Sequence, residues 1–286
     1  MKFARIAIVL AVLAIAASAY CQSFSQGLVS VRQLGMGGAG IAVADDAYAW
    51  IQNPAGLPNL QAPEANGKWR FNTVAGSSFS SHDFDCGELE IRDWTISAVD
   101  PNRKWGVGGG LGFFANDADG ITTGWGVGAG TRYGENSPWS GGISYANVTR
   151  PRFFMDGDRF FETDNIFMVG WMYDVRLTDH SPVRLGLVVS DLTDQIQRQF
   201  NFGASFWITP NLLLATDFVG IGSFDRTWNA GAEYRFPGWN WCLRAGDNDG
   251  RFTFGGGYRY HDWYADYAHT EKDGQRINAV SIGYEF

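Results

Sequence analysis

The chain of 286 residues is long enough to bury one large hydrophobic core or two smaller ones. Its formal net charge of −8 excludes the basic surface that nucleic-acid binding requires, so no nucleic-acid partner is expected. Aromatic residues make up 15% of the chain and glycines number 37, a combination that is unusual for a soluble enzyme. It is typical of a transmembrane β-barrel, in which aromatic side chains girdle the outside and small or polar groups fill the inside.

The first residues have the pattern of an export signal. Two basic residues precede an apolar run that ends in Ala17-Ser18-Ala19, small residues at the positions that a signal peptidase reads. The run is shorter than the roughly 20 residues that a membrane-spanning helix needs. We therefore predict a cleaved signal peptide over residues 1–19 and a mature chain that starts near Tyr20. A lipoprotein signal at Cys21 is the alternative, although Tyr20 occupies the place of a small residue.

A glycine-rich stretch follows, GMGGAGIAVADDAYAWIQNPAGL. Gly35, Gly37 and Gly40 fit the G-x-G-x-x-G spacing of a dinucleotide-binding loop. That loop needs a buried strand before the glycines, a long helix after them and a ribose-binding acid about 20 residues onward. Here Asp45 and Asp46 come too soon and the chain breaks at Asn53-Pro54, so no cofactor is predicted.

From about Lys68 to Phe286 the chain divides into short runs in which apolar residues alternate with small or polar ones. A soluble β-sandwich also alternates, but its apolar face points inward and tolerates fewer bulky aromatic residues at strand ends. We predict an all-β fold, a transmembrane antiparallel barrel of about fourteen strands. The strands are expected to start near Trp69, Leu89, Lys104, Ile121, Trp139, Asn165, Pro182, Gln199, Asn211, Thr227, Trp239, Arg251, Asp262 and Arg276.

The connections between these runs predict the orientation of the barrel. With the N-terminal segment on the periplasmic side, odd-numbered connections face the cell exterior, and they are mostly the longer ones. The longest is Arg150–Thr163, and Asp247–Gly250 is another. Acidic residues in these outer loops are expected to lie near divalent-bridged lipopolysaccharide. The last strand, which ends in Tyr284 and Phe286, is the predicted contact with the barrel-assembly machinery.

Two neighbouring runs each carry glycine at every second position. Glycine weakens a strand unless another group must approach its backbone closely. The pattern indicates either contact with the N-terminal segment in the lumen or glycines that let the wall bend. The glycines are Gly106, Gly108, Gly110 and Gly112 in the third run, and Gly124, Gly126, Gly128 and Gly130 in the fourth.

Charged residues fall on the predicted inner face of several runs. A charge that faced lipid near the membrane midplane would cost about 2–4 kcal/mol, which supports this assignment. Two interpretations remain: a polar channel or docking surface for the N-terminal segment, or paired charges that only hold the shape of the barrel. The residues are Arg184, Glu233, Arg235, Arg244, Arg251, Arg259, Asp266 and Glu285.

No enzyme is predicted. The four histidines have no metal-site spacing, and no G-x-S-x-G nucleophile motif occurs. Cys21, Cys86 and Cys242 are too scattered to define a disulfide framework or a metal site, so no metal is expected.

The N-terminal stretch resembles the signature of the outer-membrane superfamily that contains FadL-type fatty-acid transporters and PorV/PorQ-type proteins. The end of the chain, LRAGDNDGRFTFGGGYRYHDWYADYAHTEKDGQRINAVSIGYEF, is similar to the closing hairpins of the PorV/PorQ branch. The positions that match the N-terminal signature are Gly37, Gly38, Gly40, Ala42, Ala44, Asp45, Asp46, Ala47, Asn53, Pro54, Ala55 and Gly56.

This resemblance implies a 14-stranded outer-membrane barrel over residues 68–286, with residues 20–67 as a hatch in its lumen. The leading hypothesis is a channel that passes small apolar compounds across the outer membrane. The alternatives are a PorV/PorQ-like component of a type IX-like secretion or surface-assembly system, and a structural barrel with a sealed lumen. The predicted hatch residues are Gly35, Gly37, Gly38, Gly40, Asp45, Asp46, Asn53, Pro54 and Ala55.

Overall fold

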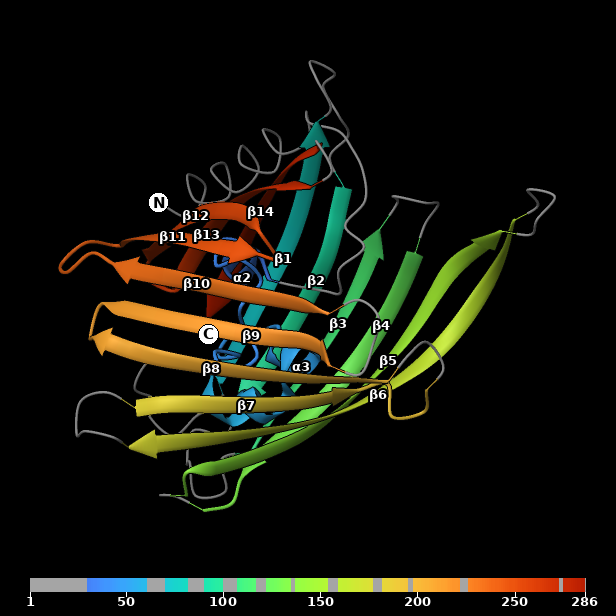
Figure 1. Ribbon diagram of the computed structural model, residues 1–286, viewed down its shortest axis with the longest axis horizontal. Helices are drawn as coiled ribbons and strands as arrows, with labels where there is room; N and C mark the ends of the chain where they lie inside the picture. The colour runs from blue at the N-terminus through green and yellow to red at the C-terminus, as the bar shows by residue number, and fades with distance from the viewer. Residues whose placement is uncertain are drawn as a thin grey trace.

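Fourteen antiparallel strands close into a barrel in the computed structural model (Figure 1), which confirms the predicted fold class and strand count. Each strand pairs with its neighbours in the chain, and β1 pairs with β14 to close the ring. The structure describes residues 30–60, 70–81, 90–99, 107–116, 122–134, 137–153, 159–176, 182–194, 198–221, 226–272 and 275–285. The predicted signal peptide lies outside these residues. So do Tyr20, Cys21, Cys86, Gly106 and Phe286, to which other predictions apply.

The strand bounds follow the predicted starts closely along most of the chain. The strands are β1 (Arg70–Ser81), β2 (Glu90–Val99), β3 (Gly108–Asn116), β4 (Thr122–Arg132), β5 (Trp139–Phe153), β6 (Arg159–Arg176), β7 (Pro182–Ser190), β8 (Gln199–Thr209), β9 (Leu212–Ile221), β10 (Thr227–Arg235), β11 (Trp241–Asn248), β12 (Arg251–Tyr260), β13 (Trp263–Lys272) and β14 (Gln275–Glu285).

The predicted loop Arg150–Thr163 is wrong, because β5 and β6 continue through most of it. Pro151 and the charged residues around it suggested a loop. However, β5 pairs with β4 only as far as Thr149, and beyond that point it pairs with β6 alone. A proline is tolerated in such a strand because one of its edges needs no hydrogen-bond donor. The β5–β6 hairpin therefore extends past its neighbours.

The connection at Asp247–Gly250 is also shorter than predicted. Asp249 and Gly250 form a two-residue hairpin turn, with φ angles of 52° and 81°. Positive φ at both positions is what a type I′ turn requires. The backbone N–H of Gly250 donates to the Asp247 carboxylate at 2.9 Å, so this carboxylate stabilises a turn.

Aromatic side chains gather on the outer face at one end of the barrel. This end, called here the C-terminal rim, carries the end of β14 and the β10–β11 and β12–β13 turns. Cross-strand aromatic pairs lie there at centroid distances of 4.2 to 4.7 Å, an arrangement typical of an aromatic girdle at a membrane interface. The pairs are Trp139–Tyr173, Trp241–Tyr258 and Trp263–Tyr284.

Of the segment that precedes the barrel strands, the structure describes residues 30–60, and these contain three short helices: α2 (Val31–Leu34), α3 (Ala49–Gln52) and the 3₁₀ helix η1 (Pro54–Asn59). The hydroxyl of Ser30 caps α2 by accepting from the backbone N–H of Gln33 at 3.2 Å. Asn53 caps η1 in the same way, and Pro54 occupies its first position, where no N–H is needed. Within the part of the chain that the structure describes, no helix is long and apolar enough to span a bilayer.

Candidate functional site

Residues Ser30–Leu60, called here the N-terminal segment, lie within the ring of strands (Figure 1). Their side chains supply much of the buried apolar core: Met36, Ala39, Ala47, Ala49, Ala55 and Leu57 are fully buried. The helices α3 and η1 contact β2 to β6, whereas α2 contacts β12 to β14. The segment thus crosses the lumen from one wall to the other.

Trp50 on α3 occupies the space that the glycines of β3 and β4 leave open. A Cβ built on Gly112 or Gly128 would lie 2.8 Å from Trp50, and one on Gly126 would overlap its ring. The indole N–H of Trp50 donates to the Thr95 hydroxyl at 2.6 Å. Contact with the N-terminal segment therefore explains the glycines at these positions.

The Asn53-Pro54 corner is clamped against the wall. Asn53 is 0% exposed, and its side-chain amide donates to the carbonyl of Ile41 at 2.9 Å while its oxygen accepts from the N–H of Ala55 at 3.1 Å. A Cβ on Gly142 would overlap the Pro54 carbonyl group. The Ser140 hydroxyl on β5 donates to the Ala55 carbonyl at 2.8 Å. The corner is a fixed point of the segment.

The glycine run of the predicted hatch packs backbone to backbone against β10, β11 and β12. Gly37 and Gly38 have φ angles of 70° and 84°, which disfavour any larger residue. A Cβ on Gly37 would lie 2.5 Å from the carbonyl oxygen of Ala230. The Gly37 N–H donates to the Thr253 hydroxyl at 2.9 Å. Gly35 contacts the backbone of Gly255. This run is tightly fitted to the wall.

Asp217 on β9 anchors the next part of the segment. Its side chain is 1% exposed, and one carboxylate oxygen accepts from the backbone N–H groups of Gly40 at 2.6 Å and Ile41 at 2.9 Å. Two backbone N–H groups that share one side-chain acceptor therefore hold residues 40 and 41 against the wall.

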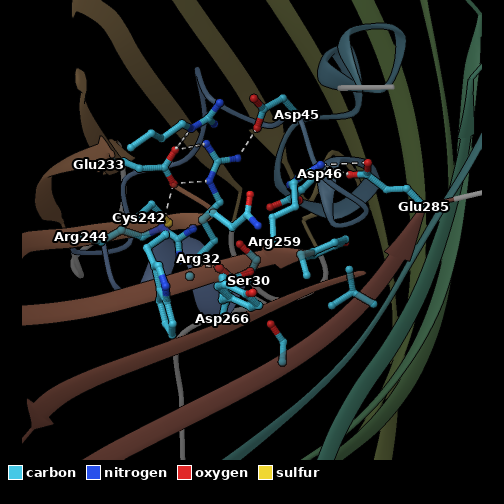
Figure 2. A pocket seen from close by; sticks show the side chains of 18 of the residues that line it. Ser30, Arg32, Asp45, Asp46, Glu233, Cys242, Arg244, Arg259, Asp266 and Glu285 are labelled. Atoms are coloured by element: carbon cyan, nitrogen blue, oxygen red, sulfur yellow. Dashed lines mark hydrogen bonds and ion pairs between the residues drawn. The ribbon is translucent and has the colours of Figure 1, made fainter. Parts of the chain in front are cut away.

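An ion-pair network also joins the segment to the barrel (Figure 2). The guanidinium of Arg32 contacts Glu233 on β10 through two nitrogens, at 2.8 and 3.1 Å, and Asp45 of its own segment at 2.5 Å. Glu233 also accepts from Arg235 at 2.9 Å and from Arg244 at 2.8 Å. The buried carboxylate of Glu233 therefore interacts with three positively charged guanidinium groups. Arg244 continues the network to Asp266 on β13 at 2.6 Å.

A cavity of about 310 Å³ adjoins the network at the C-terminal rim. The N-terminal segment lines it with Ser30, Arg32, Asp45, Asp46 and Tyr48. The barrel lines it with charged and aromatic side chains, including Arg259, which pairs with Glu285 at 2.9 Å.

Asp46 faces this cavity, and no arginine in the described part of the chain lies within ion-pair distance of its carboxylate. The pKa of its carboxyl group is raised from 3.8 to about 6, because the effects of burial and of the Asp45 charge outweigh the opposing effects of Arg32 and of hydrogen bonds to the carboxylate. The carboxylate accepts from the backbone N–H of Tyr48 at 2.9 Å.

The predicted inner-face charges divide into two groups. Six of them line the cavity, and they are Glu233, Arg235, Arg244, Arg259, Asp266 and Glu285. Arg184 instead pairs with Asp174 on β6 at 2.6 Å, and Arg251 is half-buried at the start of β12.

The sequence-based prediction missed Arg32, Trp50 and Asp217. Arg32 had a detectable signal, because it is the single basic residue between positions 30 and 60, where Asp45 and Asp46 are the acids. Asp217 had no detectable signal in the sequence, because the position of an isolated acid in an alternating strand does not indicate its partner. Among the described residues, no group of three or more His, Cys, Asp or Glu side chains could hold a metal ion, and Cys242 has a free thiol.

These features define a closed fourteen-stranded barrel whose lumen holds its own N-terminal segment. No protein-family model matches the chain, and no curated protein sequence is significantly similar to it. Its fold is that of FadL-like barrels of known structure.

Three solved structures illustrate this likeness. CymD, described as a monoaromatic hydrocarbon channel, superposes with a TM-score of 0.60 at 15% identity over 92% of this chain and 98% of that one. The Pseudomonas putida toluene transporter TodX gives 0.57 at 13% identity, with 93% and 98% covered. A FadL homologue of Pseudomonas aeruginosa gives 0.53 at 11% identity, with 90% and 98% covered.

Proposed function

We propose that the chain is an outer-membrane channel for small apolar compounds and that the N-terminal segment is its hatch. The observation that carries this proposal is a covalently attached segment that crosses the lumen and leaves a cavity of about 310 Å³ beside it. A solute can pass such a segment only where the segment moves or leaves a path. Movement next to an existing cavity requires less repacking than movement through a close-packed core.

The structural neighbours support the substrate class. Two of them are described as a monoaromatic hydrocarbon channel and a toluene transporter, and this chain covers 98% of each. The outer-membrane location is supported by the aromatic girdle at the C-terminal rim. Under this proposal the chain is exported by a signal peptide over residues 1–19, is assembled through its C-terminal strand, and contacts lipopolysaccharide through its outer loops.

Uptake of radiolabelled toluene by bacterial cells tests the proposal. Cells that produce the chain are expected to take up toluene several-fold faster than cells with an empty vector. Replacement of Asn53 with alanine removes the hydrogen bonds to Ile41 and Ala55, so it should change the uptake rate or admit small polar solutes. Equal uptake with and without the chain, with a folded barrel verified by heat-modifiable gel migration, would contradict a channel and leave a sealed structural barrel or a secretion component.

A secretion or surface-assembly role, as in PorV/PorQ-type proteins, is the second candidate. The β5–β6 hairpin favours it, because it extends past its neighbours and exposes 55% of Phe161. A protein partner could dock on such a projecting hairpin. Under this alternative, a secreted protein should co-purify with the chain, removal of the hairpin tip should abolish that association, and toluene uptake should stay at the empty-vector level.

A further inference from the structure

The cavity at the C-terminal rim has the size and the position of a site for a small ligand. Its volume of about 310 Å³ is at the lower end of the range of ligand pockets, about 300–1,000 Å³. Trp239 and Asn240, exposed residues of the β10–β11 turn, help to line it, so it can be reached from solvent at this rim. It can therefore hold one small organic molecule between the N-terminal segment and the barrel.

The charges that line this cavity do not balance. The lining contains four guanidinium groups and five carboxylates. Arg259 and Glu285 form one pair, and a network of three arginines and three acids is balanced within itself. Asp46 is the remaining charged group of the lining, so the cavity carries one excess negative charge at neutral pH. The members of the network are Arg32, Arg235, Arg244, Asp45, Glu233 and Asp266.

Asp46 is half-buried where it borders the cavity. Its carboxylate accepts hydrogen bonds from the backbone N–H of Tyr48, at 2.9 Å, and from the Ser30 hydroxyl. Both donors are neutral, so they orient the carboxylate without neutralising its charge. Arg32 is already engaged by two other carboxylates. The pKa of Asp46, raised to about 6, reflects this incomplete compensation, which a cation in the cavity would remove.

The lining suits an organic cation better than a metal ion. Calcium takes about 6–8 oxygen ligands, among them several carboxylates. The other acids of the cavity are already ion-paired, and the described residues contain no cluster of three or more His, Cys, Asp or Glu side chains that could hold a metal. Tyr48, Tyr264 and Val74 also line the cavity and provide apolar surface. This combination matches a molecule with one positive charge and an apolar body.

We propose that the cavity is a binding site for a small primary amine whose ammonium group pairs with the carboxylate of Asp46. The apolar body of the amine lies against the tyrosine side chains of the lining. The bound amine bridges the N-terminal segment and the barrel wall. This site goes beyond the proposed function, because the passage of apolar compounds requires no ammonium partner.

Isothermal titration calorimetry of the full chain in detergent micelles tests the site. Phenethylamine, titrated near pH 7.5, should bind with a Kd below about 1 mM after the signal of empty micelles is subtracted. The alcohol 2-phenylethanol has nearly the same shape but no charge, and it should bind at least about tenfold more weakly.

Two substitutions at the same rim separate a local contact from general attraction. Asp46→Asn keeps the size of the side chain and removes its charge, so it should weaken phenethylamine binding at least about tenfold and leave 2-phenylethanol unaffected. Asp262→Asn is the matched control, because Asp262 is exposed in the β12–β13 turn and is not part of the lining. It should leave the affinity for phenethylamine unchanged.

Three results would overturn the site: no binding of phenethylamine, equal affinity for the amine and the alcohol, or equal weakening by Asp46→Asn and Asp262→Asn. If Asp46→Asn does not give a folded, heat-modifiable barrel, the comparison of amine and alcohol on the unaltered chain decides alone. Binding of calcium chloride without binding of the amine would also reject the amine site. Amine binding without toluene uptake would keep the site and reject the channel, and the reverse result would reject the site and keep the channel.

Discussion

The two halves of the N-terminal segment are held in the same lumen by different chemistry. Residues 49–60 fill spaces beside glycine backbones with a tryptophan ring and a proline corner. The half around Arg32 and Asp45 is fastened by ion pairs and adjoins a cavity. Close packing tolerates almost no displacement, whereas ion pairs beside a cavity can separate and be solvated. The comparison shows that packing holds residues 49–60, whereas around Arg32 and Asp45 ion pairs are added to the packing.

The largest expected effect comes from emptying the packed half. Trp50→Ala should weaken docking of residues 49–60 by about 3–5 kcal/mol, because it deletes a buried ring and its hydrogen bond to Thr95. Hydrogen exchange of residues 50–60 measures this loss. Trp125→Ala, which removes an exposed ring from the outer face of β4, is the control and should leave that exchange unchanged. Equal effects of the two substitutions would refute the anchor.

A smaller effect should follow from overfilling the same site. A methyl group on Gly126 would overlap the Trp50 ring and approach the Tyr145 carbonyl at 2.7 Å, so Gly126→Ala should cost about 1–3 kcal/mol. On Gly109 of β3 the nearest atom would be 3.6 Å away, and Gly109→Ala should be nearly neutral. Urea unfolding followed by tryptophan fluorescence compares the two variants. The Gly126→Ala penalty should shrink in a Trp50→Ala background, and a purely additive result would mean that the glycine serves the wall alone.

The smallest expected effect is a pH dependence of the charged half. Burial raises the pKa of Asp46 from 3.8 to about 6, so the docked segment binds a proton more readily than the undocked one. The surrounding charges are Arg32, Asp45 and the more distant barrel groups of the cavity. Docking should therefore be strongest near pH 4 and weaken by at most about 3 kcal/mol as the pH rises through 6.

Exchange protection of residues 42–48, corrected for intrinsic rates, measures this trend. Asp46→Asn should abolish the change between pH 4 and pH 7, and residues 50–60 should show no such change in either protein. Protection of residues 42–48 that increases over the same range in the unaltered protein would contradict the assignment.

Much of the barrel could be predicted from alternation alone. Strand side chains alternate between the two faces, so the aromatic runs at β10, β11, β12 and β14 revealed which face is outside. The predicted end of β5 and the predicted start of β6 were wrong, because Pro151 and its charged neighbours are typical of a loop. Whether such residues are tolerated depends on which edge of a strand is paired, and this is a property of the sheet.

The site was less accessible to prediction. The glycines at every second position of β3 and β4 indicated that another group approaches the backbone of these strands closely. They did not identify Trp50 as that group. The charges of β10, β11 and β13 could be placed inside, yet Arg32, which pairs with Glu233 of β10, lies about two hundred residues away in the chain. The resemblance drew attention to the glycine run and to Asn53-Pro54 as parts of a hatch, and the structure shows both tightly packed.

The sequence by itself determined the fold class, the strand count and the inward face of the wall, because these follow from local periodicity and from the cost of placing charge against lipid. Only the tertiary structure decided which residues of the N-terminal segment are fixed and which border empty space. These properties depend on residues that are far apart in the chain, as in the Arg32–Glu233 contact and in the lining of the cavity. A local sequence pattern cannot predict which distant residues come into contact.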